Sequence, residues 1–267
     1  MRTLKLATLT LAALLPVAGH AHKAWLLPSA TVSTVDQWIT VDGAVSNDLF
    51  YFNHVPLRVD ALTITAPDGS KIQPQNSATG KYRTTFDVHL QKNGTYRIAI
   101  ANAGLNASYE ENGQMKRWRG SAAEFAKAVP ANAQKLRVSE SASRIETFVT
   151  AGKPTTDALK LTNVGLELAP VTHPNDLYAG DEATFALMLD GKPATNLPVT
   201  IVAGGTRYRD AQEEIEVKTD AQGKFSVTWP APGMYWLETE FQDDKTSIPQ
   251  ATQRRVSYVA TFEVLPQ

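Results

Sequence analysis

Regular alternation of apolar and polar side chains is the feature that most restricts how this chain can fold. From Tyr82 to Leu90, Tyr, Thr, Phe, Val and Leu occupy every second position, and polar or ionisable residues lie between them. Successive side chains of a strand point to opposite faces, so this period of two predicts a half-buried strand with one solvent-facing side. Similar segments recur and are separated by turn sequences, among them Asn93-Gly94 and Asp190-Gly191. We therefore expect an all-β protein built from β-sandwiches.

A short linker-like stretch indicates where the chain divides. Residues 151–156 read Ala-Gly-Lys-Pro-Thr-Thr and follow a strand-like segment at 145–149. The lengths on either side suit one sandwich each. The predicted architecture is two immunoglobulin-like or transthyretin-like β-sandwich domains, at residues 22–152 and 158–267, with one short helix in a loop insertion.

That helix is expected between Ser121 and Val129. Ser121 and Glu124 have capping-box spacing, and Pro130 limits the helix at its far end. The preceding segment, residues 106–119, is largely polar. We expect it to form a large, mobile surface loop beside the ligand site, because long loops of this kind often carry function.

A basic and aromatic cluster, Lys116-Arg117-Trp118-Arg119, lies in the same segment. Arginine binds carboxylates through paired hydrogen bonds, and an aromatic ring can stack on a bound group. The cluster therefore suits an anionic ligand such as a carboxylate-bearing metal chelate. A solvated loop without a ligand is the alternative.

The first residues have the pattern of an export signal. A basic start at residues 1–5 precedes an apolar run at 6–17, and small residues precede a cleavage point after Ala21. The apolar run is too short to span a membrane as a helix. We predict a signal peptide at residues 1–21 and a periplasmic protein without a membrane anchor.

Composition excludes several kinds of site. The chain contains no cysteine, which rules out disulfides, thiolate metal sites and a lipidated N-terminal cysteine. Lys and Arg total 26 and Asp and Glu total 27, so no nucleic-acid partner is expected. No common catalytic motif is present, and we expect no catalytic residues. A divalent-transition-metal site would then have to rely on histidine.

Four histidines follow the predicted cleavage point, and each is a candidate metal ligand. His54 lies in an aromatic stretch, where packing among core rings is the alternative. His89 shares a strand face with Asp87, where simple solvation is the alternative. His173 precedes Asp176 by three residues, where a local turn is the alternative.

His22 has a property that the other three histidines lack. As the first residue of the mature chain, it offers both its α-amine and a ring nitrogen to one ion. We expect His22 to bind the metal together with His54 or His173. A frayed terminus with an idle histidine is the alternative.

The mature start, His22-Lys23-Ala24-Trp25-Leu26-Leu27-Pro28, resembles that of a periplasmic family of unknown function associated with nickel and cobalt uptake. The second half, with Asp190-Gly191-Lys192-Pro193 and Ala231-Pro232-Gly233, resembles transthyretin-like or Cna-B-like sandwich modules. The resemblance implies a β-rich periplasmic protein that handles a divalent metal such as nickel or cobalt, with copper, iron and zinc left open.

Three functions compete at this point. The leading one is a non-catalytic protein that binds a metal ion or metal chelate and supports uptake or delivery, with a membrane metal transporter as partner. The second is a β-sandwich module that binds a partner or ligand without metal. The third is a copper-dependent redox enzyme with an N-terminal histidine brace.

Overall fold

A computed structural model describes residues 22–267, so the predicted signal peptide lies outside the described residues. The described part is an all-β sandwich structure, as predicted, with α1 (Ala122–Ala128) as its single α-helix and two short 3-10 helices, η1 (Asp157–Leu159) and η2 (Thr206–Tyr208). Within these residues, no helix has both the length and the apolar character needed to cross a membrane.

The strands in chain order are β1 (Lys23–Pro28), β2 (Val32–Ser33), β3 (Gln37–Ser46), β4 (Val55–Pro56), β5 (Leu62–Thr65), β6 (Lys71–Ile72), β7 (Gln75–Thr79), β8 (Thr84–Leu90), β9 (Gly94–Glu111), β10 (Gln114–Gly120), β11 (Gln134–Ala151), β12 (Leu166–Pro170), β13 (Glu182–Leu189), β14 (Lys192–Pro193), β15 (Pro198–Ala203), β16 (Ile215–Lys218), β17 (Lys224–Thr228), β18 (Gly233–Asp243) and β19 (Ala251–Val264).

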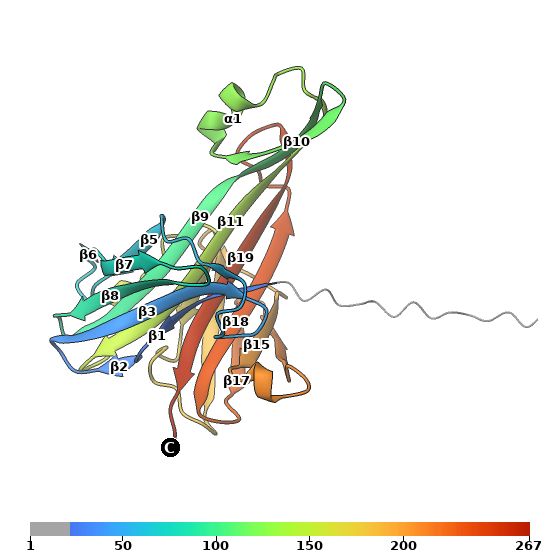
Figure 1. Cartoon of the computed structure of the whole chain (residues 1–267). Helices are drawn as coiled ribbons and strands as arrows, with labels where there is room; N and C mark the ends of the chain where they lie inside the picture. The colour runs from blue at the N-terminus through green and yellow to red at the C-terminus, as the bar shows by residue number, and fades with distance from the viewer. Residues whose placement is uncertain (1–21) are drawn as a thin grey trace, which may run out of the picture.

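These strands form three sheets. The first sheet has the order β1-β3-β8-β7, with β4 also paired to β3. The second sheet contains strands from both halves of the chain and is called the shared sheet below. It has the order β16-β15-β18-β19-β11-β9-β5-β6, with β10 added to β9 and β2 to β11. The third sheet joins β12, β13 and β14, with β17 on β13. The shared sheet is the tallest in Figure 1 because of its long strands β9, β11, β19 and β18.

The shared sheet continues from the N-terminal half of the chain into the C-terminal half. β11 pairs in parallel with β19, from Val138 beside Ala251 to Thr147 beside Thr261. β11 itself ends at Ala151, and no strand lies between it and η1. The two halves therefore have backbone hydrogen bonds in common, in addition to the chain connection.

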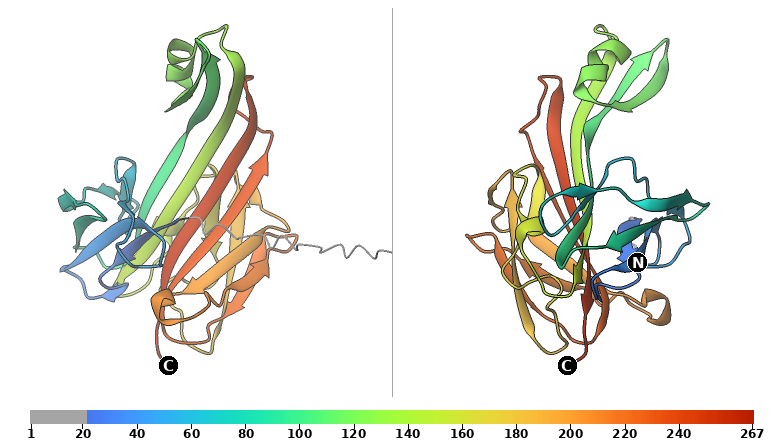
Figure 2. Two further views of the ribbon diagram at one scale, coloured as in Figure 1. Left: turned by 45° about the vertical axis from the view of Figure 1, so that its right-hand side comes forward. Right: turned by 90° about the vertical axis from the view of Figure 1, so that its left-hand side faces the viewer.

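The two main cores lie on opposite faces of the shared sheet. Val149 of β11 packs into the core beneath the first sheet, and its neighbour Phe148 packs into the core beneath the third sheet. On β19, Val259 likewise packs into the core beneath the first sheet, and Tyr258 packs into the core beneath the third sheet. Adjacent residues of a strand face opposite sides, so one strand serves both cores. Figure 2 shows the first and third sheets on either side of the long strands.

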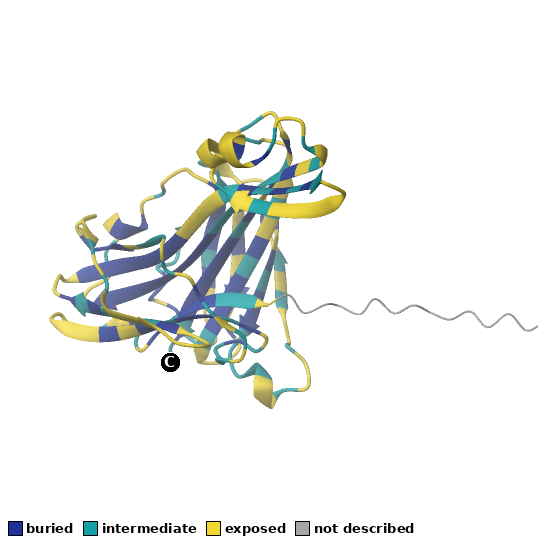
Figure 3. Cartoon of the chain, turned by 45° about the horizontal axis from the view of Figure 1, so that its top comes forward, coloured by how far each residue is buried: buried dark blue, intermediate teal, exposed yellow. Residues whose placement is uncertain are grey.

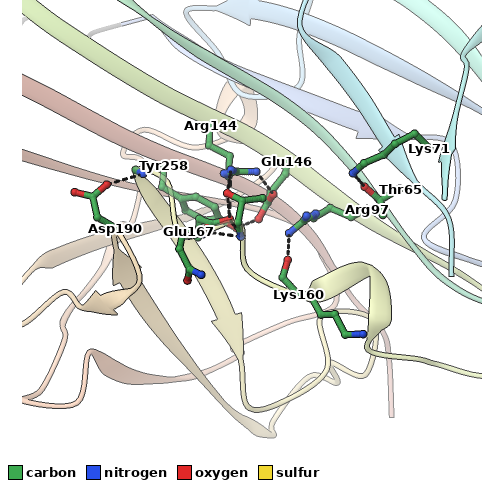
Figure 4. Close-up of polar contacts among 12 residues, drawn as sticks. Thr65, Lys71, Arg97, Arg144, Glu146, Lys160, Glu167, Asp190 and Tyr258 are labelled. Atoms are coloured by element: carbon green, nitrogen blue, oxygen red, sulfur yellow. Dashed lines mark hydrogen bonds and ion pairs between the residues drawn. The ribbon is translucent and has the colours of Figure 1, made fainter. Parts of the chain in front are cut away.

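A buried polar cluster joins the shared sheet to the third sheet (Figure 4). Arg144 of β11 contacts Glu167 of β12 at 3.3 Å and Glu146 at 3.7 Å. Tyr258 of β19 donates a hydrogen bond to Glu146 at 2.7 Å. Burial raises the pKa of Glu146, although Arg97 and Arg144 lower it. Removal of one member would leave a buried partner unpaired, which is costly.

The predicted loop at residues 106–119 is wrong. This segment is the end of β9 and nearly all of β10, paired in a regular hairpin from Gln114–Glu111 to Gly120–Leu105. Its turn is Asn112-Gly113, and both residues have positive φ, as two-residue hairpin turns require. The polar sequence reflects a strand pair with one face open to solvent. Figure 3 shows the exposed β10.

The helix prediction is confirmed. α1 begins after Ser121, whose backbone N–H donates to Glu124 Oε2 at 2.9 Å. Its buried residue Phe125 packs over Leu105 and Ala107 of β9 in a small separate core. The helix thus covers one face of the hairpin and leaves the other face uncovered.

Because β11 and β19 pair along most of their lengths, we expect the two halves to unfold together. Differential scanning calorimetry of the exported protein should give one cooperative transition. Two well-separated transitions, each assignable to one half, would show that the shared sheet does not couple the halves.

Candidate metal centre

Two of the four candidate histidines lie against each other. The rings of His22 and His54 are stacked, with centroids 3.7 Å apart and planes within 3° of parallel. His22 immediately precedes β1 and His54 immediately precedes β4. Both strands pair with the same end of β3, since Lys23 lies beside Ser46 and Val55 beside Val45. The pairing of three strands therefore brings the two rings together.

Trp25 holds the loop that carries His54. Its ring is fully buried, and its Nε1 donates to Ser46 Oγ at 2.8 Å. Phe50 and Phe52 of the loop both pack against it with ring centroids 5.5 Å away. Trp25 comes three residues after His22. One short segment thus supplies a candidate ligand and the anchor for its partner.

The same loop is closed by Asn53. The backbone N–H of Asn47 donates to Asn53 Oδ1 at 2.9 Å, and Asn53 Nδ2 donates to Asp48 Oδ2 at 2.7 Å. These bonds fix the residue directly before His54. The ring of His54 is half-buried, whereas His22 is exposed.

A lysine and a largely buried carboxyl group lie near the start of β1. Lys23 Nζ lies 5.5 Å from the centroid of the Trp236 ring. Burial raises the pKa of Glu238 to about 7, Glu240 adds to the increase, and Lys23 opposes it. Glu238 therefore places a carboxylate near the residue that follows His22. Sequence reasoning missed it, although Trp236, Glu238 and Glu240 alternate along one strand face.

His89 lies at the other end of β3, where its strand neighbour is Trp38. Its ring stacks on the Trp38 ring at 4.3 Å, and its Nε2 is 2.8 Å from Asp36 Oδ1. Asp87 shares its strand face, but that carboxylate accepts hydrogen bonds from Thr40 and Asn76. The ten-residue length of β3 separates His89 from His22 by roughly 30 Å.

His173 is held by hydrogen bonds at both ring nitrogens. Nδ1 accepts from the Asn175 backbone N–H at 3.1 Å, which leaves the proton on Nε2. Nε2 is 2.9 Å from Thr95 Oγ1 and 3.2 Å from the Thr155 carbonyl oxygen. Burial lowers the pKa of His173, which disfavours the charged form of the ring.

The same contacts place His173 far from His22. Thr95 bonds to Thr150, and the backbone N–H of Thr150 donates to the carbonyl of Thr31, just beyond the far end of β1. The structure therefore brings His22 and His54 together and places His89 and His173 elsewhere.

Side chains alone supply two candidate ligands at this place. Within residues 22–267, no group of three or more His, Cys, Asp or Glu side chains has an arrangement that could hold a metal ion. A third nitrogen, the α-amine of His22, becomes free only when the chain is cut before that residue.

The stacked geometry also sets a condition on metal binding. An imidazole nitrogen directs its lone pair in the plane of the ring, and two parallel planes do not meet. One ring must turn before both can bind the same ion. His22 is exposed at the start of β1 and has room for that rotation.

The pKa of Glu238 predicts how stability depends on pH. The ordinary value is 4.5 and the folded value is about 7, so the folded protein binds this proton more tightly than the unfolded chain. The associated stability is present below pH 4.5 and is lost as the pH rises through about 7.

Glu238→Gln should raise the free energy of unfolding by about 1–2 kcal/mol above pH 7 and change it little at low pH. Chemical denaturation across this range measures the effect, with exposed Glu182→Gln as control. An equal effect at both pH values would contradict the assignment.

Comparison with known proteins gives a family for most of the chain. Residues 19–243 match the family described as "Domain of unknown function (DUF4198)". A search of curated proteins found no match.

Several solved structures are similar to this chain. The D0-D1 domain of intimin has 14% identity, covers 90% of this chain and 97% of its own, and has a TM-score of 0.23. A DUF4785 family protein from Legionella pneumophila has 9% identity, with 80% of this chain and 50% of its own covered and a TM-score of 0.24. Alpha-2-macroglobulin from Escherichia coli has 12% identity, with 92% and 20% covered and a TM-score of 0.24. From the match across residues 19–243, the chain belongs to the DUF4198 family, a domain of unknown function.

Proposed function

We propose that this protein binds a divalent transition metal through His22 and His54 in the periplasm and supports the uptake or delivery of that metal. The observation that carries the proposal is the stacking of these two rings at 3.7 Å. Two histidines 32 positions apart in the chain meet at a place fixed by strand pairing and by Trp25. His54 is held by its loop, and His22 is free to turn toward a shared ion.

The proposed ligand set is completed by cleavage after Ala21. The α-amine and one ring nitrogen of His22 then bind the same ion as a chelate, and His54 adds a second imidazole. Nitrogen donors of this kind suit nickel, cobalt, copper and zinc. The resemblance of the mature start to the nickel- and cobalt-associated family favours nickel or cobalt as the cargo.

The proposed role is carriage without catalysis. An exposed His22 ring gives a path for the ion to enter and leave, which suits transfer to a membrane metal transporter. A copper-dependent redox enzyme would use the same two histidines, so redox activity has to be measured alongside binding.

Metal titration of protein exported with its signal peptide tests the proposal. Mass spectrometry first verifies that the chain begins at His22. His54→Ala should weaken nickel, cobalt and copper binding by about tenfold or more, because even outer partners of metal ligands contribute about 10–100-fold. An extra residue before His22 should also weaken binding, because it moves the amine away from the ring. His89→Ala is the matched control and should bind like the wild type.

Equal affinity of the wild type, His54→Ala and the extended form would contradict the proposed site. Loss of binding in His54→Ala with full binding in the extended form would show that the amine is not a ligand. Copper-dependent turnover of ascorbate or a polysaccharide would favour the enzyme alternative.

A further inference from the structure

A second site is indicated by the uncovered face of the β9–β10 hairpin. A cavity of about 690 Å³ lies there. Asn106 and Ser108 of β9, with Arg117 and Arg119 of β10, form part of its lining. Ala107 and Trp118 of the hairpin also line it, and β11 and β19 contribute the other residues.

The strand register explains why polar side chains gather on this face. Along β9, Ile98 and Ile100 pack under the first sheet. The same face of β9 continues with Asn106 and Ser108, which lie beyond the edge of the first sheet. The intervening residues, such as Ala107, face α1 instead. The change from apolar to polar at every second position marks where the first sheet ends and an open surface begins.

Three arginines converge on this surface. Ser108 lies between Arg117 of β10 and Arg137 of β11, and Arg119 lies beside Asn106, one step along the same face. Neighbouring strands are about 4.8 Å apart and alternate residues about 7 Å apart. The three Cα atoms thus lie roughly 7–12 Å from one another, within the combined reach of arginine side chains around one small molecule.

No acidic side chain lines this cavity. The nearby carboxylates of Glu110 and Glu111 are paired with Lys135 and Lys116. Among the ion pairs and side-chain hydrogen bonds of residues 22–267, the arginines at 117, 119 and 137 take part in none. Guanidinium groups held together without anions repel one another, so a bound anion would be favourable.

Trp118 is among the residues that line the cavity, and its ring also packs against the small core under α1. It packs edge-on against Phe125 of α1, with ring centroids 5.6 Å apart. The stacking expected for the Lys116–Arg119 cluster stays a prediction. The other groups that could recognise a ligand are the three arginines and neutral hydrogen-bonding side chains such as Ser139 and Gln253.

We propose that this cavity binds a small polyanion whose carboxylate or phosphate groups accept hydrogen bonds from Arg117, Arg119 and Arg137. Each guanidinium group presents paired N–H donors that match the oxygens of such groups. Three of them around one cavity favour a ligand that carries more than one negative charge. The cavity volume is that of a small-molecule site. This proposal is independent of the metal centre, because His22 and His54 lie outside the cavity.

Isothermal titration calorimetry of the exported protein in metal-free buffer at low salt tests the proposal. Citrate and pyrophosphate are the two probes, and acetate is the single-charge comparison. The wild type should bind at least one of the two polyanions and bind acetate far more weakly. A tighter citrate complex would identify carboxylates as the ligand groups, and a tighter pyrophosphate complex would identify phosphates.

The triple variant Arg117→Gln, Arg119→Gln, Arg137→Gln should weaken polyanion binding by at least about tenfold, because charge-assisted hydrogen bonds are lost. The matched control removes three exposed lysines instead: Lys192→Gln, Lys218→Gln and Lys224→Gln. It should bind within about twofold of the wild type, as should His54→Ala.

Circular dichroism and thermal melting establish that both triple variants are folded. Absence of polyanion binding to the wild type would overturn the proposal. Equal affinity of the arginine variant and the wild type would do so as well, as would an equal loss in the lysine control.

Discussion

The parallel pairing of β11 with β19 is the constraint on which the rest of the structure depends. It joins strands that are more than a hundred residues apart in the chain and makes one sheet from both halves. β18 then pairs with β19, and this places Trp236 beneath β1. Trp236 Nε1 donates to the Ala24 carbonyl oxygen at 3.0 Å, two residues after His22. The position of the candidate metal centre therefore depends on the C-terminal half as well as the N-terminal half.

The same pairing explains why the two proposed ligand sites lie on different surfaces. The shared sheet is longer than either sheet packed on it, because β9 and β11 each run for 18 residues. The first sheet covers only part of their length. The histidine pair lies in the first sheet, at the start of β1 and β4, and the uncovered end of β9 and β11 carries the arginine site with β10. Neither site requires residues from the other.

Much of the fold could be predicted from local patterns. Alternation from Tyr82 to Leu90 and capping residues at Ser121 and Glu124 act over a few neighbouring residues, and both gave the correct element. The hairpin at 106–119 was missed although Leu105, Ala107 and Tyr109 alternate with polar residues, because the segment is polar overall. Its Asn112-Gly113 turn was the available signal. The continuity of the shared sheet depends on contacts between distant residues, which periodicity does not report.

The sites were predictable to a smaller degree, for the same reason. The sequence singled out His22 and His54 by residue type and by the expected cleavage point, but it did not distinguish His54 from His173. Strand register makes that distinction, since β1 and β4 meet at one end of β3. The raised pKa of Glu238 comes from burial and the nearby Glu240, which depend on how the first sheet lies over β18.

Anomalous diffraction from crystals of the exported protein loaded with nickel or cobalt tests the central claim most directly. We expect one strong peak within bonding distance of the His22 amine, a His22 ring nitrogen and a His54 ring nitrogen, with the two rings no longer parallel. A peak at His89 or His173, or no peak near His22 in protein that begins at that residue, would contradict it.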